Sequence, residues 1–558
     1  MLMMLVGLSG CDSTTNIEDY INEQSDAPAY NPSQKVTIGD FTPSSGSVGQ
    51  QLVIYGSNFG NDPSLVKVVI GGKPAPVVSV NGDCLYTFIP SKSFTGEIVI
   101  TVGEGAQAQT VTADKNFTYD RKMVVGKLCG YKLPDDSQGW IDGPFETCAG
   151  FRNDGVMQFS PYNHDQLFIV YDQEPHFGTV AHGVQLLDLK EKTVRTILPL
   201  GMFSNQRLRT IDFAVDPFAY EEDGTLVDYA NSGWISTATP DQKKWREHLI
   251  LSADNGDSDR RTQSVYIVDR DGKGDFSADS RVRQLANYVQ CNGASLQPSD
   301  DGISHELYFT SYADGEFLRL DMDAYWRCIF NEETWNPYVK DNELNQFESL
   351  FKVQDTGWEF QIDIHPTGNY AYIVVINQQY ILRTDYSKDQ RRYMNPYIVA
   401  GSQGQRGFVD GVGQSTRFAR PYQGTFVKND AYEAAGKSDV YDFYICDNSW
   451  DPNHTGDPGN EVHAIRYLTP EGVVRTYAGG SRSTHSDNVP YGAENGELRD
   501  VARFDRPTGL VNDFHIDKVT GEKTLIFYIL DTMNRAIRTI TMEGSDEELD
   551  DDEPIENN

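Results

Sequence analysis

Four arginines occupy equivalent places in this sequence and are the first candidates for binding chemistry. Each stands at the start of a run of apolar and β-branched residues that predicts a strand: Arg152, Arg209, Arg420 and Arg506. Guanidinium groups bind carboxylate and sulfate oxygens in a bidentate manner, so four of them at one place would bind an acidic ligand. Trp358, which stands before another such run, and Tyr422, which follows Arg420, complete the candidate ligand-binding set. In the alternative interpretation, each arginine is structural and pairs with an aspartate of its own segment, such as Asp212 or Asp505.

The sequence contains no catalytic motif of the common kinds. Its 10 histidines are scattered, and neither His-Glu-x-x-His nor Gly-x-Ser-x-Gly occurs. The catalytic residues are therefore unknown, and the pattern favours a protein that is not an enzyme.

Two aspartate-rich segments, residues 254–259 and 269–275, resemble calcium loops. Calcium prefers several closely spaced oxygen ligands, but Lys273 would place a positive charge at the fifth position of an EF-type loop. Both segments also lie between predicted strands, where Asp-Gly is ordinary hairpin chemistry. We therefore expect no metal site and no cofactor, with calcium as the one ion to consider.

Aromatic side chains are the usual platforms for sugar rings. The predicted loops carry all seven tryptophans, at positions 140, 234, 245, 326, 335, 358 and 450. Tryptophan also fills protein cores, so each one taken alone is more readily a core residue than a binding residue.

The first ten residues are apolar and end in Leu8-Ser9-Gly10-Cys11. This resembles the lipobox of bacterial lipoproteins, which implies that Cys11 is acylated and becomes the mature N-terminus. Residues 1–10 are short for a signal peptide and have no basic start, so we expect that an upstream part of the signal is missing. The polar residues 11–35 predict a flexible tether. The alternative is a chance apolar N-terminus with an unmodified cysteine.

Charge and cysteine content limit the class of protein. The formal net charge is −35, which argues against a nucleic-acid partner because phosphate backbones need clustered Lys and Arg. Part of the acidic excess lies in residues 546–558, which predict a disordered tail. The six other cysteines form no CxxC and have no zinc-ligand spacing, so we expect buried free thiols, although their spacing also permits disulfides.

Residues 36–120 alternate strand-like runs with turns about every ten residues. Four turn or strand motifs recur here: Pro43 to Gly46, Gly56 to Gly60, Ile70 to Gly72, and Phe117-x-Tyr119. Together they resemble the IPT/TIG family of immunoglobulin-like domains. The resemblance implies a β-sandwich that acts as a spacer, although some such domains bind partners.

Residues 121–545 contain a loose repeat. Asp410-Gly411 precedes Arg420-Pro421, and Asn495-Gly496 precedes Arg506-Pro507, while Asp142-Gly143 opens a partial copy. These elements resemble NHL repeats, which implies an all-β chain whose second domain is a six-bladed β-propeller. We expect the six innermost strands to start near Val156, Ile211, Ala294, Phe360, Gln423 and Gly509.

Two consequences follow from the propeller. Innermost strands begin at the same mouth of a central channel, so the four arginines and Trp358 should meet there and make that mouth electropositive. The last blade lacks an outer strand, and the run Met123 to Gly126 is similar to the strands that end other blades. We expect this run to complete the sixth blade and close the ring, which removes an exposed edge.

The combination of lipobox, IPT/TIG domain and NHL-type propeller resembles surface lipoproteins of polysaccharide-utilisation systems. It implies a protein that is lipid-anchored in the outer membrane, faces the cell exterior, and binds a glycan or other small extracellular ligand for a neighbouring outer-membrane importer. This inference rests on architecture rather than on a recognised site. The alternatives are a hydrolase or lyase that acts at the central channel, and a scaffold for protein interactions.

Overall fold

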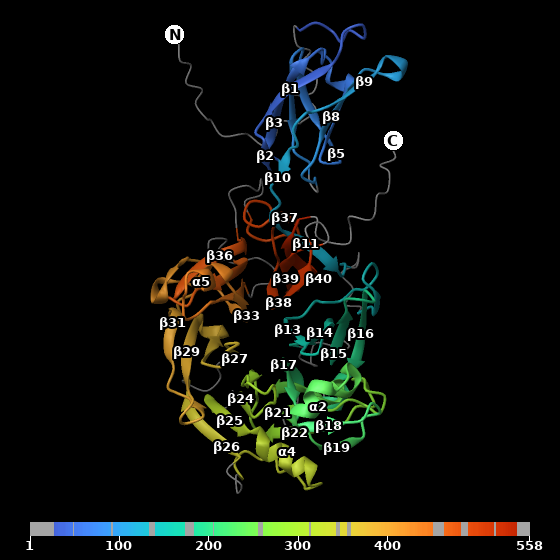
Figure 1. The fold of residues 1–558 in the computed structure, drawn as a ribbon. Coiled ribbons are helices and arrows are strands. Elements are labelled where there is room, and N and C mark those ends of the chain that lie inside the picture. Colours follow the sequence, from blue (N-terminus) through green and yellow to red (C-terminus); the bar gives the residue numbers. More distant parts are fainter. Residues whose placement is uncertain are drawn as a thin grey trace. The chain divides into compact units, whose positions relative to one another are not determined.

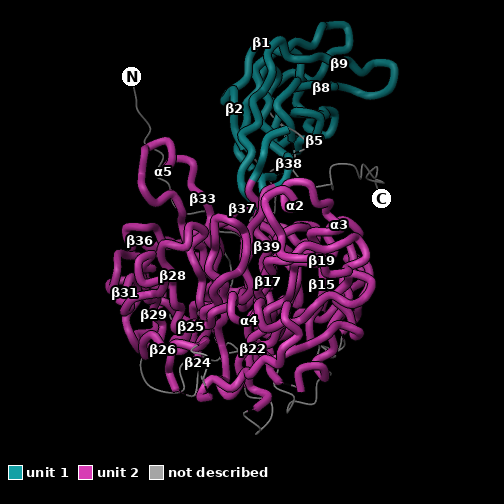
Figure 2. The backbone as a smooth tube through the Cα atoms, turned by 60° about the horizontal axis from the view of Figure 1, so that its bottom comes forward, with its two compact units in different colours: residues 1–124, 515–524, 541–558 teal, residues 125–514, 525–540 magenta. Residues whose placement is uncertain are grey.

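The computed structural model describes residues 27–543 except 48, 91–92, 133–139, 173–182, 205, 255–260, 312–313, 342–345, 354–358, 450–461, 481–488 and 518–520. It divides into two compact units (Figure 2). One comprises residues 1–124, 515–524 and 541–558, and the other residues 125–514 and 525–540. Among the described residues, no helix is both long enough and apolar enough to cross a membrane.

The first unit contains a sandwich of two four-stranded sheets. One sheet has the order β1 (Thr37–Thr42), β3 (Gln51–Ser57), β7 (Cys84–Phe88), β6 (Val77–Asn81), and the other β5 (Lys73–Ala75), β4 (Val66–Ile70), β8 (Ile98–Val102), β9 (Gln109–Thr112). The short strands β2 (Ser45–Gly46) and β10 (Thr118–Tyr119) pair in parallel. Alternate residues of the strands, such as Leu52, Ile54, Val68 and Ile100, form one buried core.

Steric contacts explain why the Gly-x-Asn-Phe-Gly turn of this unit begins with a glycine. A Cβ atom on Gly56 would lie 2.0 Å from the carbonyl oxygen of Thr37 and 2.4 Å from the ring of Phe59. Asn58 adopts a left-handed conformation with φ of 62°, and its amide donates hydrogen bonds to the carbonyls of Asn31 and Gln34. The motif therefore allows a close approach of chain segments that larger residues would prevent.

The second unit is a six-bladed β-propeller, and Figure 1 shows its blades following one another in chain order. The first three blades, from inner to outer strand, are β13 (Gly155–Ser160), β14 (Asn163–Tyr171), β15 (Val184–Asp188), β16 (Thr193–Leu198); β17 (Arg207–Val215), β20 (Glu247–Asp254), β21 (Ser264–Val268), β22 (Val282–Asn287); and β23 (Ala294–Leu296), β24 (Glu306–Ser311), β25 (Glu316–Asp321), β26 (Phe347–Lys352). The last three are β27 (Phe360–Ile364), β28 (Tyr370–Val375), β29 (Tyr380–Ser387), β31 (Tyr397–Gly401); β33 (Pro421–Lys428), β34 (Tyr441–Asn448), β35 (His463–Leu468), β36 (Val473–Gly479); and β38 (Pro507–Ile516), β39 (Lys523–Asp531), β40 (Ala536–Met542), β11 (Met123–Cys129).

Smaller elements decorate these blades. Two-residue strands add a fifth strand to four blades: β12 (Gly143–Pro144), β30 (Arg392–Tyr393), β32 (Gly411–Val412) and β37 (Gly496–Glu497). The longer connections hold the hairpin β18 (Phe218–Tyr220) and β19 (Leu226–Tyr229), and the helices α2 (Ser232–Thr237), α3 (Pro240–Lys243), α4 (Met322–Phe330) and α5 (Asp430–Ala434). The predicted all-β fold is confirmed, and all six expected inner strands are present.

Closure of the ring by the start of the propeller is also confirmed. Strand β11 lies between β37 and β40 and so provides the outer strand of the last blade. Across this pairing, Arg538 Nε donates to the carbonyl oxygen of Gly126 at 3.3 Å.

The repeated Asp-Gly, Asp and Arg positions form one buried network in each well-preserved blade. In the fifth blade, Arg466 has no exposed surface, and its guanidinium contacts Asp410 at 2.9 Å and Asp447 at 3.0 Å. Asp447 also accepts the backbone N–H groups of Ala419 and Arg420. The network thus joins the short outer strand to the segment that leads into the inner strand.

The same network recurs in the sixth blade with Arg538, Asp531 and Asn495. In the first blade, Gln185 replaces the arginine and donates to Asp142 at 3.0 Å. The sequence repeat therefore records a hydrogen-bond network rather than a ligand site.

The six cysteines of the described residues are free thiols, as expected from their spacing, and all but Cys84 are buried. Burial raises the pKa of Cys291 to about 11, so this thiol is protonated and unreactive near neutral pH.

Disruption of β11 should destabilise the propeller. Val125 is 2% exposed, so Val125→Asp places a carboxylate in an apolar site and should cost about 3 kcal/mol. We expect a lower thermal unfolding temperature and more aggregation. The control is Lys127→Thr, because Lys127 is an exposed residue of the same strand; equal melting of both variants would show that β11 contributes little to closure.

Candidate functional site

The inner strands of the propeller surround a polar cavity of about 230 Å³. Its lining draws on all six blades and includes Gln158, Asp212, Gln361, Asp363 and Gln423. These side chains come from alternate positions of strands that turn one face to the channel. The cavity therefore concentrates amide and carboxylate groups at the centre of the ring.

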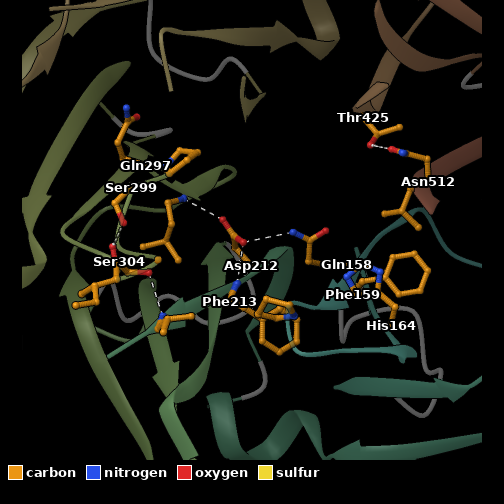
Figure 3. A pocket seen from close by; sticks show the side chains of 17 residues that line it. Gln158, Phe159, His164, Asp212, Phe213, Gln297, Ser299, Ser304, Thr425 and Asn512 are labelled. Atoms are coloured by element: carbon orange, nitrogen blue, oxygen red, sulfur yellow. Dashed lines mark hydrogen bonds between the residues drawn. The ribbon is translucent and has the colours of Figure 1, made fainter. Parts of the chain in front are cut away.

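A wider pocket of about 470 Å³ adjoins this cavity and shares Gln158, Asp212, Thr425 and Val511 with it. It lies where the inner strands end, and Figure 3 shows its side chains coming from several blades. One side is formed by the segment from Leu296 to Ser304, which links the first two strands of the third blade. We call the two hollows together the channel pocket.

Hydrogen bonds fix the polar side chains of the channel pocket (Figure 3). Asp212 accepts the backbone N–H of Phe213 at 2.8 Å and that of Leu296 at 2.9 Å, and the Gln158 amide at 3.4 Å. Thr425 Oγ1 donates to Asn512 Oδ1 at 2.6 Å. This bond fixes the orientation of the Asn512 amide, which lines the pocket.

Aromatic rings form part of the same wall. Phe159 and Phe213 line the pocket, and Phe159 stacks on His164 with ring centroids 5.5 Å apart. His164 Nδ1 lies 2.9 Å from Asp513 Oδ1. The pocket therefore combines apolar faces with oriented polar groups, which is typical of small-molecule sites.

The ionisable side chains of the channel pocket are mainly acidic. Its lining residues include Asp212 and Asp363 but no lysine or arginine. Burial raises the pKa of Asp212. Burial and the nearby charge of Asp212 raise the pKa of Asp363 well above its usual range. An anionic ligand would find no counter-charge among these side chains.

The arginines predicted from the sequence gather at the opposite mouth, where the inner strands start. Asp154 lies between Arg420 Nη1 at 2.8 Å and Arg506 Nε at 2.7 Å. Burial acts to raise the pKa of Asp154, but these two guanidinium groups outweigh it and lower the pKa. The Arg420 guanidinium also lies over the ring of Tyr422, with 4.7 Å to the ring centroid.

Arg209 extends this charged cluster. Its Nη1 lies 2.7 Å from Asp172 and its Nη2 lies 3.5 Å from Glu359. The Arg209 charge is the largest influence that lowers the pKa of Glu359. Three of the predicted arginines and Tyr422 are thus together, as expected.

Their partners differ from the expectation, because the acids come from other blades and not from the arginine's own segment. Asp154 precedes the first blade, whereas Arg420 and Arg506 precede the fifth and sixth. In the described residues, Arg209, Arg420 and Arg506 are each paired with a carboxylate of Asp154, Asp172 or Glu359. Arg152 lies two residues before Asp154, and its carbonyl accepts a hydrogen bond from Arg535. Trp358 lies outside the described residues.

In the two aspartate-rich segments considered as calcium loops, the aspartates that the structure describes make other contacts. Asp254 binds Arg207 at 2.7 Å, and residues 255–260 lie outside the described part. The Asp271 carboxylate accepts the N–H groups of Lys273 and Asp275 within its own turn. In the described residues, no group of three or more His, Cys, Asp or Glu side chains is arranged to hold a metal ion.

Sequence reasoning missed the residues of the channel pocket. They belong to no motif, and Asp212 was considered only as a partner for an arginine. A signal was present, because polar residues alternate with apolar ones in Gln361-Ile362-Asp363-Ile364. Such alternation in an inner strand predicts polar side chains that face the channel.

Comparison with known proteins supports both parts of the architecture. The model of the IPT/TIG domain family matches residues 37–119. A solved structure from Bacteroides thetaiotaomicron, described as a putative phosphatase, is 40% identical over 92% of this chain and 99% of that chain, with a TM-score of 0.72. This chain belongs to the same family. Its expected architecture, an IPT/TIG domain with a six-bladed propeller, is confirmed.

Two further solved structures that resemble this chain carry a different description. An auxiliary nutrient binding protein from Bacteroides thetaiotaomicron is 33% identical over 92% of this chain and 99% of that chain, with a TM-score of 0.68. An auxiliary nutrient binding protein from Bacteroides ovatus is 28% identical over 92% and 100%, with a TM-score of 0.57. No curated protein matches the chain.

The arginine cluster should contribute to stability rather than to binding. Arg420→Met removes one of the two cations that hold buried Asp154 and should cost about 3 kcal/mol. We expect a lower unfolding temperature and an unchanged ligand affinity per folded molecule. Arg475→Met, at an exposed position of β36, is the control. A loss of affinity without a loss of stability would instead assign Arg420 to the binding site.

Proposed function

We propose that this protein is an accessory nutrient-binding protein that binds a glycan in the channel pocket. The observation that carries the proposal is the pocket itself, where oriented amide and carboxylate groups stand beside aromatic rings. The relatives described as auxiliary nutrient binding proteins support the nutrient class. The choice of a glycan as the nutrient is our own.

The chemistry of the pocket suits saccharides. Sugar hydroxyls both donate and accept hydrogen bonds, and planar side chains such as Gln158, Asp212 and Asn512 offer both functions in fixed directions. Phe159 and Phe213, which are 9% and 6% exposed, offer apolar edges that can contact the C–H groups of a sugar. A volume of about 470 Å³ falls within the range of small-molecule sites and suits a short saccharide. Because no lysine or arginine lines the pocket, the ligand is not an acidic glycan.

Anchoring and location complete the proposal. Cys11, which lies outside the described residues, carries the lipid and holds the protein in the outer membrane with its binding unit facing the exterior. The glycan then passes to a neighbouring outer-membrane importer. The net charge of −35 keeps such a surface protein soluble and away from nucleic acids.

Binding should depend on Asn512. Asn512→Ala removes the amide donor and should weaken glycan affinity about tenfold, in keeping with the loss of one to two hydrogen bonds. Isothermal calorimetry with a glycan selected from an array provides the measurement. The matched control is Asn377→Ala, because Asn377 lines a separate cavity beside Glu359 and Arg420. A loss of affinity in the control alone would place the ligand at the arginine mouth.

The alternative of a hydrolase has one observation in its favour, since two carboxylates line one cavity and the relative with 40% identity is described as a putative phosphatase. The same protein sample is therefore incubated with p-nitrophenyl phosphate and with the bound glycan. Turnover that disappears in Asp212→Asn would favour the enzyme over the binding protein. Capture of a protein partner with no glycan binding would favour the scaffold.

The anchor is tested separately. Cys11→Ala removes the acylation site, so the full-length protein should move from the membrane fraction to the soluble fraction of cells. Cys84→Ala, which changes a half-buried thiol of the IPT/TIG domain, should leave the protein with the membranes. Retention of the Cys11→Ala variant in the membrane fraction would refute lipid anchoring.

A further inference from the structure

Asp212 and Asp363 form an uncompensated pair in the channel pocket. They are the acidic residues in the lining of the inner cavity, and that lining contains no basic residue. Asp363 Oδ2 is buried and has no hydrogen-bond partner among the described residues. A buried carboxylate without a partner is stable only in its protonated form, and a cation bound beside the pair would stabilise the ionised form instead.

Gln361 gives a second, independent sign of a missing ligand. It lies two residues before Asp363 on the same strand and lines the same cavity. The side chain is 3% exposed, and its Nε2 donor has no partner in the described part of the chain. An unsatisfied buried donor costs about 1–3 kcal/mol, and a ligand hydroxyl could accept this hydrogen bond.

A cation beside the pair would keep both carboxylates ionised, and a metal ion fits the site poorly. Calcium takes six to eight oxygen ligands. The two oxygens of Asp212 already accept hydrogen bonds from Phe213, Leu296 and Gln158, and the Ser295 side chain adds a further one, which leaves few lone pairs for a metal. A primary ammonium group needs one acceptor from each carboxylate and has three donors to distribute.

We propose that Asp212 and Asp363 bind the ammonium group of an amino sugar, with the sugar ring in the wider part of the channel pocket. The inference rests on the proposed glycan-binding function and names its substrate class. The two parts of the pocket share Gln158 and Asp212, so a saccharide in the wider part can place an amine beside the carboxylates. The ammonium replaces the absent counter-charge, and Gln361 Nε2 donates to an adjacent hydroxyl.

The test compares two trisaccharides that differ in charge but share their ring stereochemistry. Chitotriose carries free amines, and tri-N-acetylchitotriose carries neutral amides. We expect calorimetry, at a pH where the amines are protonated, to give at least about tenfold tighter binding of chitotriose to the wild-type protein, equivalent to about 1.4 kcal/mol. Asp363→Asn should remove this preference and leave the affinity for the acetylated sugar unchanged.

A folding check accompanies the comparison. Asp363→Asn keeps the shape of the side chain and removes a buried titratable group, so its unfolding temperature should equal or exceed that of the wild type. A second variant, Asp385→Asn, removes an exposed carboxylate of β29 and should keep the preference for chitotriose. Loss of the preference in this control would show that the amine is attracted by net charge and would overturn the assignment.

The remaining outcomes separate this inference from the proposed function. Equal affinity for both sugars, or binding of neutral glycans alone, overturns the amino-sugar assignment and leaves glycan binding intact. Failure of every glycan on an array overturns the proposed function. If calcium chloride alone raises the unfolding temperature of the wild type but not of Asp363→Asn, the carboxylates bind a metal ion and the ammonium proposal is wrong.

Discussion

Closure of the propeller by β11 is the constraint on which the rest of the second unit depends. Each blade buries one face against the next, and an open ring would leave two such faces and two sheet edges exposed. With β11 paired to β40, all six inner strands are held around one axis. The polar cavity and the arginine cluster exist because these strands approach each other, so both depend on a pairing formed far from either site.

The two ends of the channel differ in how their buried polar and charged groups are paired. At the starts of the inner strands, Asp154 and Asp172 from one region of the chain hold arginines from others, so buried charges are matched and join blades together. At the other end, Asp212 accepts hydrogen bonds, and Asp363 Oδ2 has no partner among the described residues. No lysine or arginine lines the pocket there. Matched buried pairs hold a structure in register, whereas unmatched polar groups are characteristic of functional sites.

The sequence predicted the parts of this protein that depend on local pattern. The turn from Gly56 to Gly60, the Asp-Gly repeats and the six inner strands follow from steric and hydrogen-bond requirements within short segments. The convergence of Arg420 and Arg506 also followed, because equivalent positions of propeller blades meet at one mouth. Their shared partner, Asp154, did not follow, since it lies 266 residues before Arg420 and no local rule selects it. The pocket residues were missed for the same reason, because Gln158 and Asp363 become neighbours only when distant blades meet.

The pairing of β11 with β40 has a consequence for the order in which the protein can form. The hydrogen bond from Arg538 to Gly126 joins residues 412 positions apart. Strand β11, the first of the propeller to be synthesised, can therefore pair only after β40, the last, has been synthesised. Contacts of such long sequence separation slow folding, because closing the long loop lowers the entropy of the chain before the contact can stabilise it. During synthesis, the five earlier blades can assemble while both edges of the incomplete ring are open. A chain truncated before residue 536 would lack β40 and would keep those edges open.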